Sequence, residues 1–521
     1  MTTRKKTIYL INPKNDYASY FGGEVFEGRL GKPGLLVADL AVTTVAALMR
    51  PYLNVMVCEQ NVEPVDFDVD CDFVGITGKL TQWQHAKEIA DRFHKRGIPV
   101  LIGGPFASLS PSTVGPYADI LVTGELEMIV EDLCADLNEG RWKATYDGIQ
   151  ADMSQTVIPA WDLYPNHRSM VGNLQVSRGC PFQCEFCDVI QYLGRKQRHK
   201  PIGKILEELD YIHKIGYTNS FISDDNFTVY RSRAKEILEA LAHWNHKDPD
   251  RSHRFVTQVS MDVTRDPEML ELLNKAGFTS IFIGIETPNE ESLKETRKLQ
   301  NTKIDLVEEL NKIYAQGVSV FAGMIVGFDN DGHDIFERQF EFAMQSAIPF
   351  FSLNFLGAME STPLYARLKK SGRLKFSHET PMETQFTTNV KFQQLSDEES
   401  MAGMQWLLTQ LYAPENFGAR LIDLIDRLGP SAVSQESPLS PRGAQITFDL
   451  FRIFRHLNKM GEKEATMYNR VMRKTMEKPQ VASIAFHFLY FYVQVRYLLD
   501  AQPDGVKMYR PELLNRSVFV A

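Results

Sequence analysis

A chain of 521 residues, of which 44% are hydrophobic, is long enough for two to four domains with substantial cores. Its formal net charge of −9 argues against a protein built around a nucleic-acid-binding surface. Six cysteines are too few for a disulfide framework, so the composition favours a reducing, cytoplasmic compartment. We expect no export signal and no transmembrane segment, because no apolar run has the required length and flanks.

Residues 1–145 alternate short apolar runs with helical patterns. This alternation predicts a doubly wound, Rossmann-like α/β domain with buried parallel strands. One helix is expected at 81–96, where Trp83, Ile89 and Phe93 recur at helical spacing. The expected strands are 8–11, 53–57, 73–77, 100–102 and 120–122. In such a domain a ligand binds beyond the carboxyl ends of the strands.

Glycines follow three of these strands at that end. They are Gly78, Gly103 with Gly104, and Gly124, which precedes Glu125. Glycine allows a ligand to approach the backbone closely, but a tight turn from strand to helix requires it equally. From the residues alone both explanations stay open.

Residues 146–172 are predicted to link two domains, because the prolines at 159 and 165 stiffen the segment. The alternation then restarts over 173–362. The expected strands are 174–177, 220–223, 255–259, 280–285, 318–326 and 350–356, and the expected helices are 202–215, 231–245, 266–275, 302–316 and 334–346. Six such units are too few for a complete eight-stranded barrel and predict an open (β/α)6 barrel, with its active site at the carboxyl ends of the strands.

Three cysteines lie within eight residues directly after the first expected barrel strand. Cys180, Cys184 and Cys187 have the spacing C-x3-C-x2-C. Thiolates at this spacing can hold one 4Fe-4S cluster and leave its fourth iron without a protein ligand. The alternatives are a zinc site or buried structural cysteines. A structural zinc site usually takes two separated ligand pairs, and the sequence contains no second C-x2-C.

Polar residues end several barrel strands. Asp224, Asp225 and Asn226 end the second, Gln258 lies on the third, and Glu286 ends the fourth. Carboxylates and amides at this rim can accept hydrogen bonds from an ammonium or a ribose. A helix N-cap is the structural alternative for Asp225.

The last range, 363–521, is predicted to be mostly helical. Ser396 and Glu399 form a capping box for a helix through about 411, and further helices are expected near 415–428, 444–460 and 480–500. The last of these is rich in aromatic residues, which predicts a core helix. The wall of a substrate cavity and a lipid-facing surface remain alternatives for it.

The cysteine spacing, with Phe186 before the third cysteine, resembles the signature of the radical S-adenosylmethionine (SAM) enzymes. In that family the open iron binds SAM, and an electron from the cluster cleaves it to a 5′-deoxyadenosyl radical. The second strand ends in Asp-Asp-Asn, where many members have Gly-Gly-Glu. The SAM contacts that the resemblance implies are Phe186, Asp224, Asp225, Asn226, Gln258 and Glu286.

An α/β domain directly before such a loop resembles the cobalamin-binding domain of the cobalamin-dependent radical SAM enzymes. The region from 363 to about 416 resembles the C-terminal extension of a subgroup that includes hopanoid methylases. The D-x-H-x-x-G motif of other cobalamin proteins is missing here, as is usual in this subgroup. The implied cobalamin contacts are Gly78, Lys79, Leu80, Thr81, Gly103, Gly104, Gly124 and Glu125, with 79–81 near the lower face of the corrin.

The resemblance implies a cobalamin-dependent methyltransferase that acts on an unactivated carbon. The first alternative is the same radical start ended by rearrangement, cyclisation or oxidation without methyl transfer. A non-catalytic cobalamin or redox sensor is disfavoured, because a sensor needs no open-iron loop. The expected partners are a small-molecule or lipid-like substrate and an electron donor such as flavodoxin or ferredoxin. Peripheral attachment to the membrane stays open.

Overall fold

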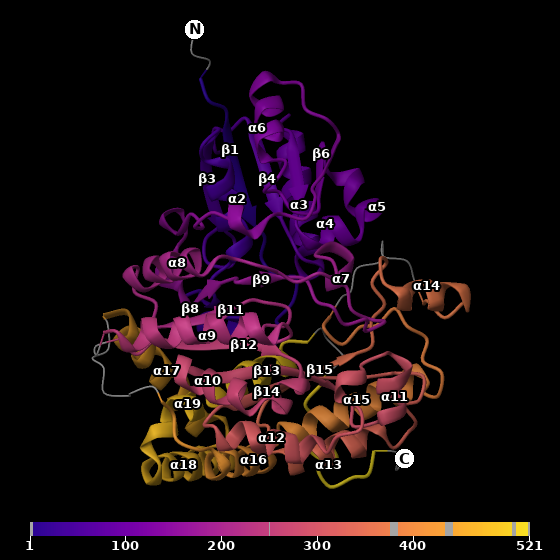
Figure 1. The fold of residues 1–521 in the computed structure, drawn as a ribbon. Coiled ribbons are helices and arrows are strands. Elements are labelled where there is room, and N and C mark those ends of the chain that lie inside the picture. The colour runs from indigo at the N-terminus through magenta and orange to yellow at the C-terminus, as the bar shows by residue number, and fades with distance from the viewer. Residues whose placement is uncertain (1–3, 249–250, 376–383, 433–440, 503–506, 519–521) are drawn as a thin grey trace.

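The computed structural model describes residues 4–248, 251–375, 384–432, 441–502 and 507–518 (Figure 1). Two parallel β-sheets organise the chain. In Figure 1 the sheet from the N-terminal part stands at the top, and the second sheet lies below it, with C-terminal helices beneath. The predicted fold class is confirmed: a doubly wound α/β region, a partial barrel and a mostly helical C-terminal region.

The first sheet is doubly wound, because helices cover both of its faces. Its parallel strands have the order β3-β1-β4-β5-β6-β7. Ile8 and Leu10 belong to the core under α2 and α6, whereas Tyr9 and Ile11 belong to a separate core under α3, α4 and α5. The strands are β1 (Thr7–Asn12), β3 (Asn54–Glu59), β4 (Phe73–Thr77), β5 (Val100–Gly103), β6 (Ile120–Thr123) and β7 (Thr145–Asp147). The helices are α2 (Leu40–Met49), α3 (Trp83–Lys95), α4 (Pro105–Leu109), α5 (Pro111–Val114) and α6 (Val130–Glu139).

The second sheet is a curled parallel sheet in the order β15-β14-β13-β12-β11-β8-β2. Six strands come from the predicted barrel: β8 (Ser169–Leu174), β11 (Asn219–Ile222), β12 (Arg254–Val259), β13 (Phe278–Glu286), β14 (Ser319–Val326) and β15 (Phe351–Phe355). The helices between them are α7 (Val189–Tyr192), α8 (Ile202–Lys214), α9 (Arg231–His246), α10 (Pro267–Ala276), α11 (Glu290–Glu295), α12 (Leu306–Ala315) and α13 (Ile335–Ser346). The seventh strand, β2 (Leu35–Val37), was not predicted. It comes from the N-terminal part and pairs with β8 at one edge.

The predicted position of the first barrel strand, 174–177, is wrong. The strand is β8, which ends where the prediction began, and the short β9 (Ser177–Arg178) pairs instead with β10 (Arg198–His199). The reason is that the Asp224 carboxylate accepts hydrogen bonds from the N–H groups of Val176 and Ser177, at 2.8 and 3.0 Å. These groups therefore have partners outside a sheet ladder, and the chain turns toward the cysteines. The ranges 1–145, 146–172, 173–362 and 363–521 remain a proposed division.

The helical C-terminal region covers the barrel and reaches back to the N-terminal part. Its helices are α14 (Pro363–Lys370), α15 (Asp397–Leu411), α16 (Pro414–Arg427), α17 (Pro441–Met460), α18 (Glu462–Glu477) and α19 (Ala482–Asp500). The capping box of Ser396 and Glu399 is present, and α18 was not predicted. The Gln494 side chain donates to Ser19 O at 2.8 Å, and the Tyr490 hydroxyl donates to Gly22 O at 2.9 Å. These contacts hold the loop before α1 (Glu24–Leu30) against α19.

Candidate active site

The cysteine loop leaves β9 at the carboxyl edge of the barrel sheet, as predicted from the order of the elements. Gly179 makes the turn with a φ of +94°, and a Cβ there would lie 2.8 Å from Lys196 O. Only glycine fits both conditions. The N–H of Cys180 then donates to Gly194 O at 3.2 Å, and the N–H of Glu185 donates to Thr296 O at 2.9 Å. The loop is thus anchored on both sides of Cys184.

The three thiols form no disulfide, and their surroundings suit an anionic cluster. Gln300 Nε2 lies 3.7 Å from the sulfur of the buried Cys184. Burial alone would lower the pKa of Lys298, but Glu286 and the nearby cysteine sulfurs raise it above its ordinary value. Within the described ranges, no three His, Cys, Asp or Glu side chains meet around a single metal-ion position. A cubane cluster does not need its thiolates to surround a single position, because each thiolate binds a different iron.

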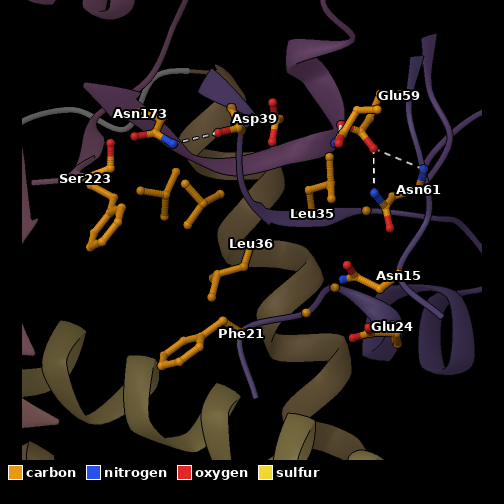
Figure 2. Close-up of a pocket in the computed structure, with 18 of the residues that line it drawn as sticks. Asn15, Phe21, Glu24, Leu35, Leu36, Asp39, Glu59, Asn61, Asn173 and Ser223 are labelled. Carbon is orange, nitrogen blue, oxygen red and sulfur yellow. Dashed lines mark hydrogen bonds between the residues drawn. The ribbon is translucent and has the colours of Figure 1, made fainter. Parts of the chain in front are cut away.

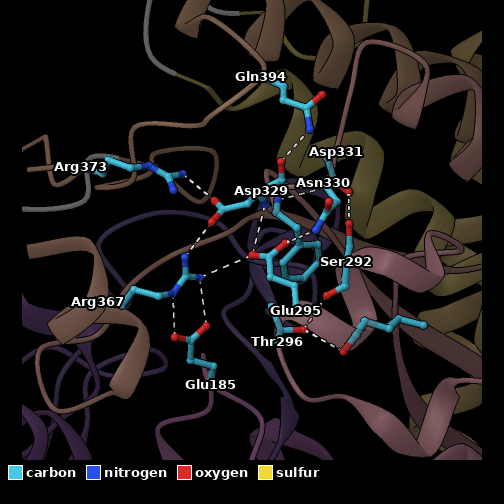
Figure 3. A network of polar contacts seen from close by, with 12 residues as sticks. Glu185, Ser292, Glu295, Thr296, Asp329, Asn330, Asp331, Arg367, Arg373 and Gln394 are labelled. Carbon is cyan, nitrogen blue, oxygen red and sulfur yellow. Dashed lines mark hydrogen bonds and ion pairs between the residues drawn. The ribbon is translucent and has the colours of Figure 1, made fainter. Parts of the chain in front are cut away.

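A charged network fastens this loop to the rest of the chain (Figure 3). Arg367 of α14 donates hydrogen bonds to both carboxylate oxygens of Glu185, at 2.7 and 2.9 Å. Its remaining nitrogen donates to Asp329 at 2.7 Å, and Arg373 donates to the other oxygen of Asp329 at 2.6 Å. Glu185 lies between the second and third cysteines, so the C-terminal region directly supports the predicted cluster loop.

We therefore expect Arg367→Ala to lower the iron content that the reconstituted protein retains. The change strips Glu185 of two charge-assisted hydrogen bonds, each worth about 1.5–3 kcal/mol in general. Iron per chain and the thermal unfolding midpoint are the measurements. Arg338→Ala removes an exposed arginine paired with Asp334 at 3.6 Å and serves as the control. Equal iron retention in both variants would contradict a supporting role for Arg367.

The polar strand ends meet near the loop, but they differ in what they already bind. Asp224 is fully buried and accepts from Val176, from Ser177 and from the Ser177 hydroxyl. Among the described residues, the N–H of Gly179 donates to Asp225, at 3.3 Å. Burial and the neighbouring Asp224 raise the pKa of Asp225 to about 7. Of the two acids, Asp225 has more acceptor capacity left for a ligand.

The other predicted SAM contacts are spread along the rim. Asn226 donates to the Ser260 hydroxyl at 2.8 Å, and Phe186 packs against Phe328 with ring centroids 6.1 Å apart. Glu286 has a φ of +66° at a β-bulge and pairs with Lys298 at 2.7 Å. A bulge at a strand end redirects a side chain, which is common beside active sites. Gln258 lies deeper and lines a cavity.

The first cavity, of about 440 Å³, lies between the two sheets (Figure 2). Its polar end carries Asn15, Glu24, Glu59 and Asn61, and Figure 2 shows Phe21 and Leu36 farther along its wall. Its apolar end is formed by side chains on the concave face of the barrel and on α19, namely Phe221, Val256, Phe282, Phe321, His487 and Phe491. The aromatic helix 482–500 therefore supplies part of a cavity wall as well as core residues.

The second cavity, of about 340 Å³, lies at the carboxyl ends of β4, β5 and β6. Of the predicted cobalamin contacts, it brings together Lys79, Gly103, Gly104, Gly124 and Glu125. The remaining three do not line it. Gly78 donates to Gly103 O at 3.4 Å, Leu80 packs at the edge of the core, and the Thr81 hydroxyl donates to Asn15 at 3.4 Å.

Glu125 is fully engaged by the protein. Arg178 donates to it at 2.8 Å and Arg198 at 2.5 Å, while the N–H of Ala151 donates at 3.1 Å. Burial would raise the pKa of Glu125, but the two guanidinium groups hold it below its usual value. The basic run after the cysteines thus meets an acid from the first sheet and joins the two parts of the chain.

Four of the described residues line both cavities and mark where they meet. They are Asp39, Lys79, Asn173 and Ser223, which we call the junction residues. Only Lys79 was predicted as a site residue. The other three were missed because no local pattern distinguishes a polar residue beside a cavity from one beside solvent.

The chain is similar to known proteins over most of its length. The model of the radical SAM superfamily matches residues 174–343, and a domain of unknown function, DUF4070, matches 362–498. The hopanoid C-2 methylase of Rhodopseudomonas palustris is 30% identical over 467 residues, which cover 86% of this chain and 86% of that protein. The chain belongs to the radical SAM superfamily.

Radical SAM enzymes hold a 4Fe-4S cluster and SAM, so these predicted cofactors and the predicted family are confirmed. An uncharacterized methyltransferase of Synechocystis sp. is 35% identical over 348 residues, 65% of this chain and 64% of that protein. The solved radical SAM enzyme OxsB, described as cobalamin-dependent and with aqua-cobalamin bound, has a TM-score of 0.61 at 14% identity. The match covers 99% of this chain and 84% of that one. This likeness confirms the fold.

Proposed function

We propose that the chain is a cobalamin-dependent radical SAM methyltransferase that methylates an unactivated carbon. The observation that carries the proposal is the meeting of two cavities at the junction residues, between the strand ends of the first sheet and the concave face of the barrel. Relatives named as methyltransferases, including the hopanoid methylase, support methyl transfer. When bound, the cluster with SAM supplies a 5′-deoxyadenosyl radical, and cobalamin supplies a methyl group.

The lining of the second cavity suits cobalamin. It extends from the glycine-rich strand ends into a slot between the sheet and α2. Leu10, Gly75 and Leu101 line one wall of the slot, and Val45 and Leu48 line the other. A corrin bound at the strand ends, with its aromatic nucleotide base in the apolar slot, would use both parts of this space. Ligands at the strand ends are the rule for doubly wound sheets.

The first cavity suits the substrate of a radical reaction. Aromatic side chains line one end of it, and this lining would shield a radical formed there from water and so from side reactions. His487 stacks on Phe491 with ring centroids 4.7 Å apart, and burial lowers its pKa to about 4. The imidazole is therefore neutral at pH 7 and presents no charge to an apolar substrate. A small molecule or a lipid-like compound with one polar end matches this lining.

Two further contacts belong to the proposal. An electron must reach the cluster from outside, and a flavodoxin or ferredoxin is the class of donor that supplies it. Peripheral contact with a membrane fits Phe448 and Phe451, which are exposed on α17 beside the exposed Arg452 and Arg455. Among the described helices, none is long and apolar enough to cross a membrane.

The deciding experiment counts products and cofactors. After anaerobic purification, iron, sulfide and corrin are measured per chain, and the reconstituted enzyme is then supplied with SAM, a reductant and candidate substrates. A methyltransferase forms S-adenosylhomocysteine together with 5′-deoxyadenosine. Formation of 5′-deoxyadenosine with a changed substrate but without S-adenosylhomocysteine would instead support rearrangement, cyclisation or oxidation.

The two adjacent acids at the second strand are expected to respond differently to mutation. Asp225→Ala should weaken SAM binding about 10- to 100-fold, the range for one charge-assisted hydrogen bond. Asp224→Ala should instead lower the unfolding midpoint, because it leaves the buried N–H groups of Val176 and Ser177 without an acceptor. SAM affinity by equilibrium dialysis and thermal unfolding measure the two effects. Unchanged SAM affinity in a folded Asp225→Ala protein would assign Asp225 to structure.

A further inference from the structure

Asn173 is a buried polar residue with an unsatisfied oxygen. It lies on β8, its exposed fraction is 9%, and it is one of the junction residues. Its Nδ2 donates to Ala38 O at 3.0 Å. Its Oδ1 has no hydrogen-bond partner within the described part of the chain. A buried amide oxygen without a partner is costly, and such groups are rare in folded proteins.

The orientation of this amide is decided by its neighbour. A carbonyl oxygen can only accept, so the group that faces Ala38 O must be the NH2 group, and a flipped amide would set two acceptors against each other. The oxygen therefore faces the other way. In Figure 2 it lies on the side of Ser223, which also lines both cavities. The position calls for a donor that the described residues do not supply.

We infer that Asn173 Oδ1 accepts a hydrogen bond from a propionamide side chain of the corrin, so that the barrel itself completes the cobalamin site. The inference rests on the proposed cobalamin-dependent function. The corrin periphery carries primary amides, whose NH2 groups are the donors this oxygen lacks. Lys79, from the first sheet, faces the same junction and was predicted near the lower face of the ring. Asn173 would then hold the cofactor from the barrel side.

This position has a consequence for catalysis. The strand that carries Asn173 leads through β9 into the cysteine loop, with Cys180 only seven positions along the chain. A corrin held by this strand is positioned relative to the cluster by one short piece of backbone. Asn173 is thus a positioning residue for the cofactor, and no covalent step is assigned to it.

The test pairs a change in the protein with a change in the cofactor. Hydroxocobalamin and its three propionamide-derived monocarboxylic acids are titrated into the reconstituted protein without SAM or substrate, with corrin absorbance as the readout. In each acid one propionamide NH2 is replaced by a carboxylate oxygen. The parent should bind one of these acids about tenfold more weakly than cobalamin, because that acid lacks the donor and sets a negative charge against Oδ1.

The variant decides whether that loss comes from Asn173. Asn173→Leu should bind cobalamin about tenfold more weakly than the parent and should no longer discriminate against the same acid. Ser223→Ala, a change at the same junction, should keep the discrimination. Two results would overturn the inference. In one, Asn173→Leu still binds that acid about tenfold more weakly than cobalamin, so that the two losses add. In the other, the parent binds cobalamin and all three acids with equal affinity. If Asn173→Leu does not fold, Asn173→Ala takes its place in the same titration, with the same expected results.

The outcomes also separate this inference from the function on which it rests. A parent that binds cobalamin without discriminating among the acids leaves the cobalamin-dependent function in place and removes the role of Asn173. A folded parent that binds no corrin removes both. Substrate is absent from the titration. If Asn173 Oδ1 instead bound substrate, the parent would therefore bind cobalamin without discriminating among the acids.

Discussion

Replacing Cys180, Cys184 or Cys187 with alanine is expected to abolish cleavage of SAM to 5′-deoxyadenosine. Each thiolate binds a different iron, and alanine offers no ligand. Each single change therefore leaves one more iron of the cluster without a protein ligand. Gln300, Lys298 and Glu286 lie near the loop, and none of them is a thiol that could replace the lost ligand. We expect reduced iron and sulfide per chain and 5′-deoxyadenosine at the level of an enzyme-free control.

The chain offers a matched control for this change. Cys71 is partly buried, lies in the N-terminal part and belongs to no disulfide. Cys71→Ala should keep the iron content and the cleavage rate of the parent. Circular dichroism establishes that each variant is folded. If all three loop variants retained parental iron and cleavage, the loop would not hold the cluster.

The strands that sequence reasoning found share a physical property. A parallel strand buried on both faces is a continuous apolar run, and β4 was predicted with the ends that it has, 73–77. The strands that it missed are short: β2 and β7 have three residues each, and β9 and β10 have two. So short a strand depends on its neighbour for stability. Leu35–Val37 becomes a strand because β8 lies beside it, and pairing over more than 130 residues of sequence leaves no local pattern.

Only part of the site was predicted, because contacts between distant parts of the chain leave no local pattern in the sequence. Residue type and spacing identified the cysteine loop, because a cluster needs its ligands close together in the chain. Glu125 was expected to contact a ligand, since it ends a strand beside a glycine. Its engagement by Arg178 and Arg198 depends on the contact between two parts of the chain. Burying a carboxylate is expensive without a cationic partner, so the acid indicated a partner without identifying it.

Asn173 marks the limit of inference from residue type. An asparagine on a strand near a loop is ordinary in sequence, and its importance lies in the carbonyl of Ala38, which takes the NH2 group and leaves the oxygen unpaired. Ala38 is 135 residues away along the chain. Unsatisfied hydrogen bonding is a property of three-dimensional neighbours, and only a structure with side chains reveals it.

The second large effect is expected at the strand ends of the first sheet, where Gly103→Val and Gly104→Val should each abolish retention of the corrin. Both glycines line the second cavity, and a β-branched side chain there occupies the space over the strand ends. The two positions differ in backbone. Gly104 has a φ of +95°, and a Cβ there would lie 3.1 Å from Gly78 N. Of the described residues, a Cβ at Gly103 would meet Val122, at 3.5 Å.

This difference separates loss of the site from loss of the fold. Gly97 also has a positive φ, of +72°, but no described atom would lie within 4 Å of a Cβ there. Neither cavity includes Gly97, so Gly97→Val is the control for strain. Gly104→Val and Gly97→Val should both lose about 1–3 kcal/mol of stability, and Gly103→Val much less. Corrin absorbance is measured after anaerobic reconstitution with hydroxocobalamin and desalting, beside thermal unfolding. We expect the absorbance to be lost in Gly103→Val and Gly104→Val and kept in Gly97→Val. Since Gly103→Val changes the cavity with little strain, a folded Gly103→Val protein that held corrin like the parent would exclude these strand ends from the cobalamin site.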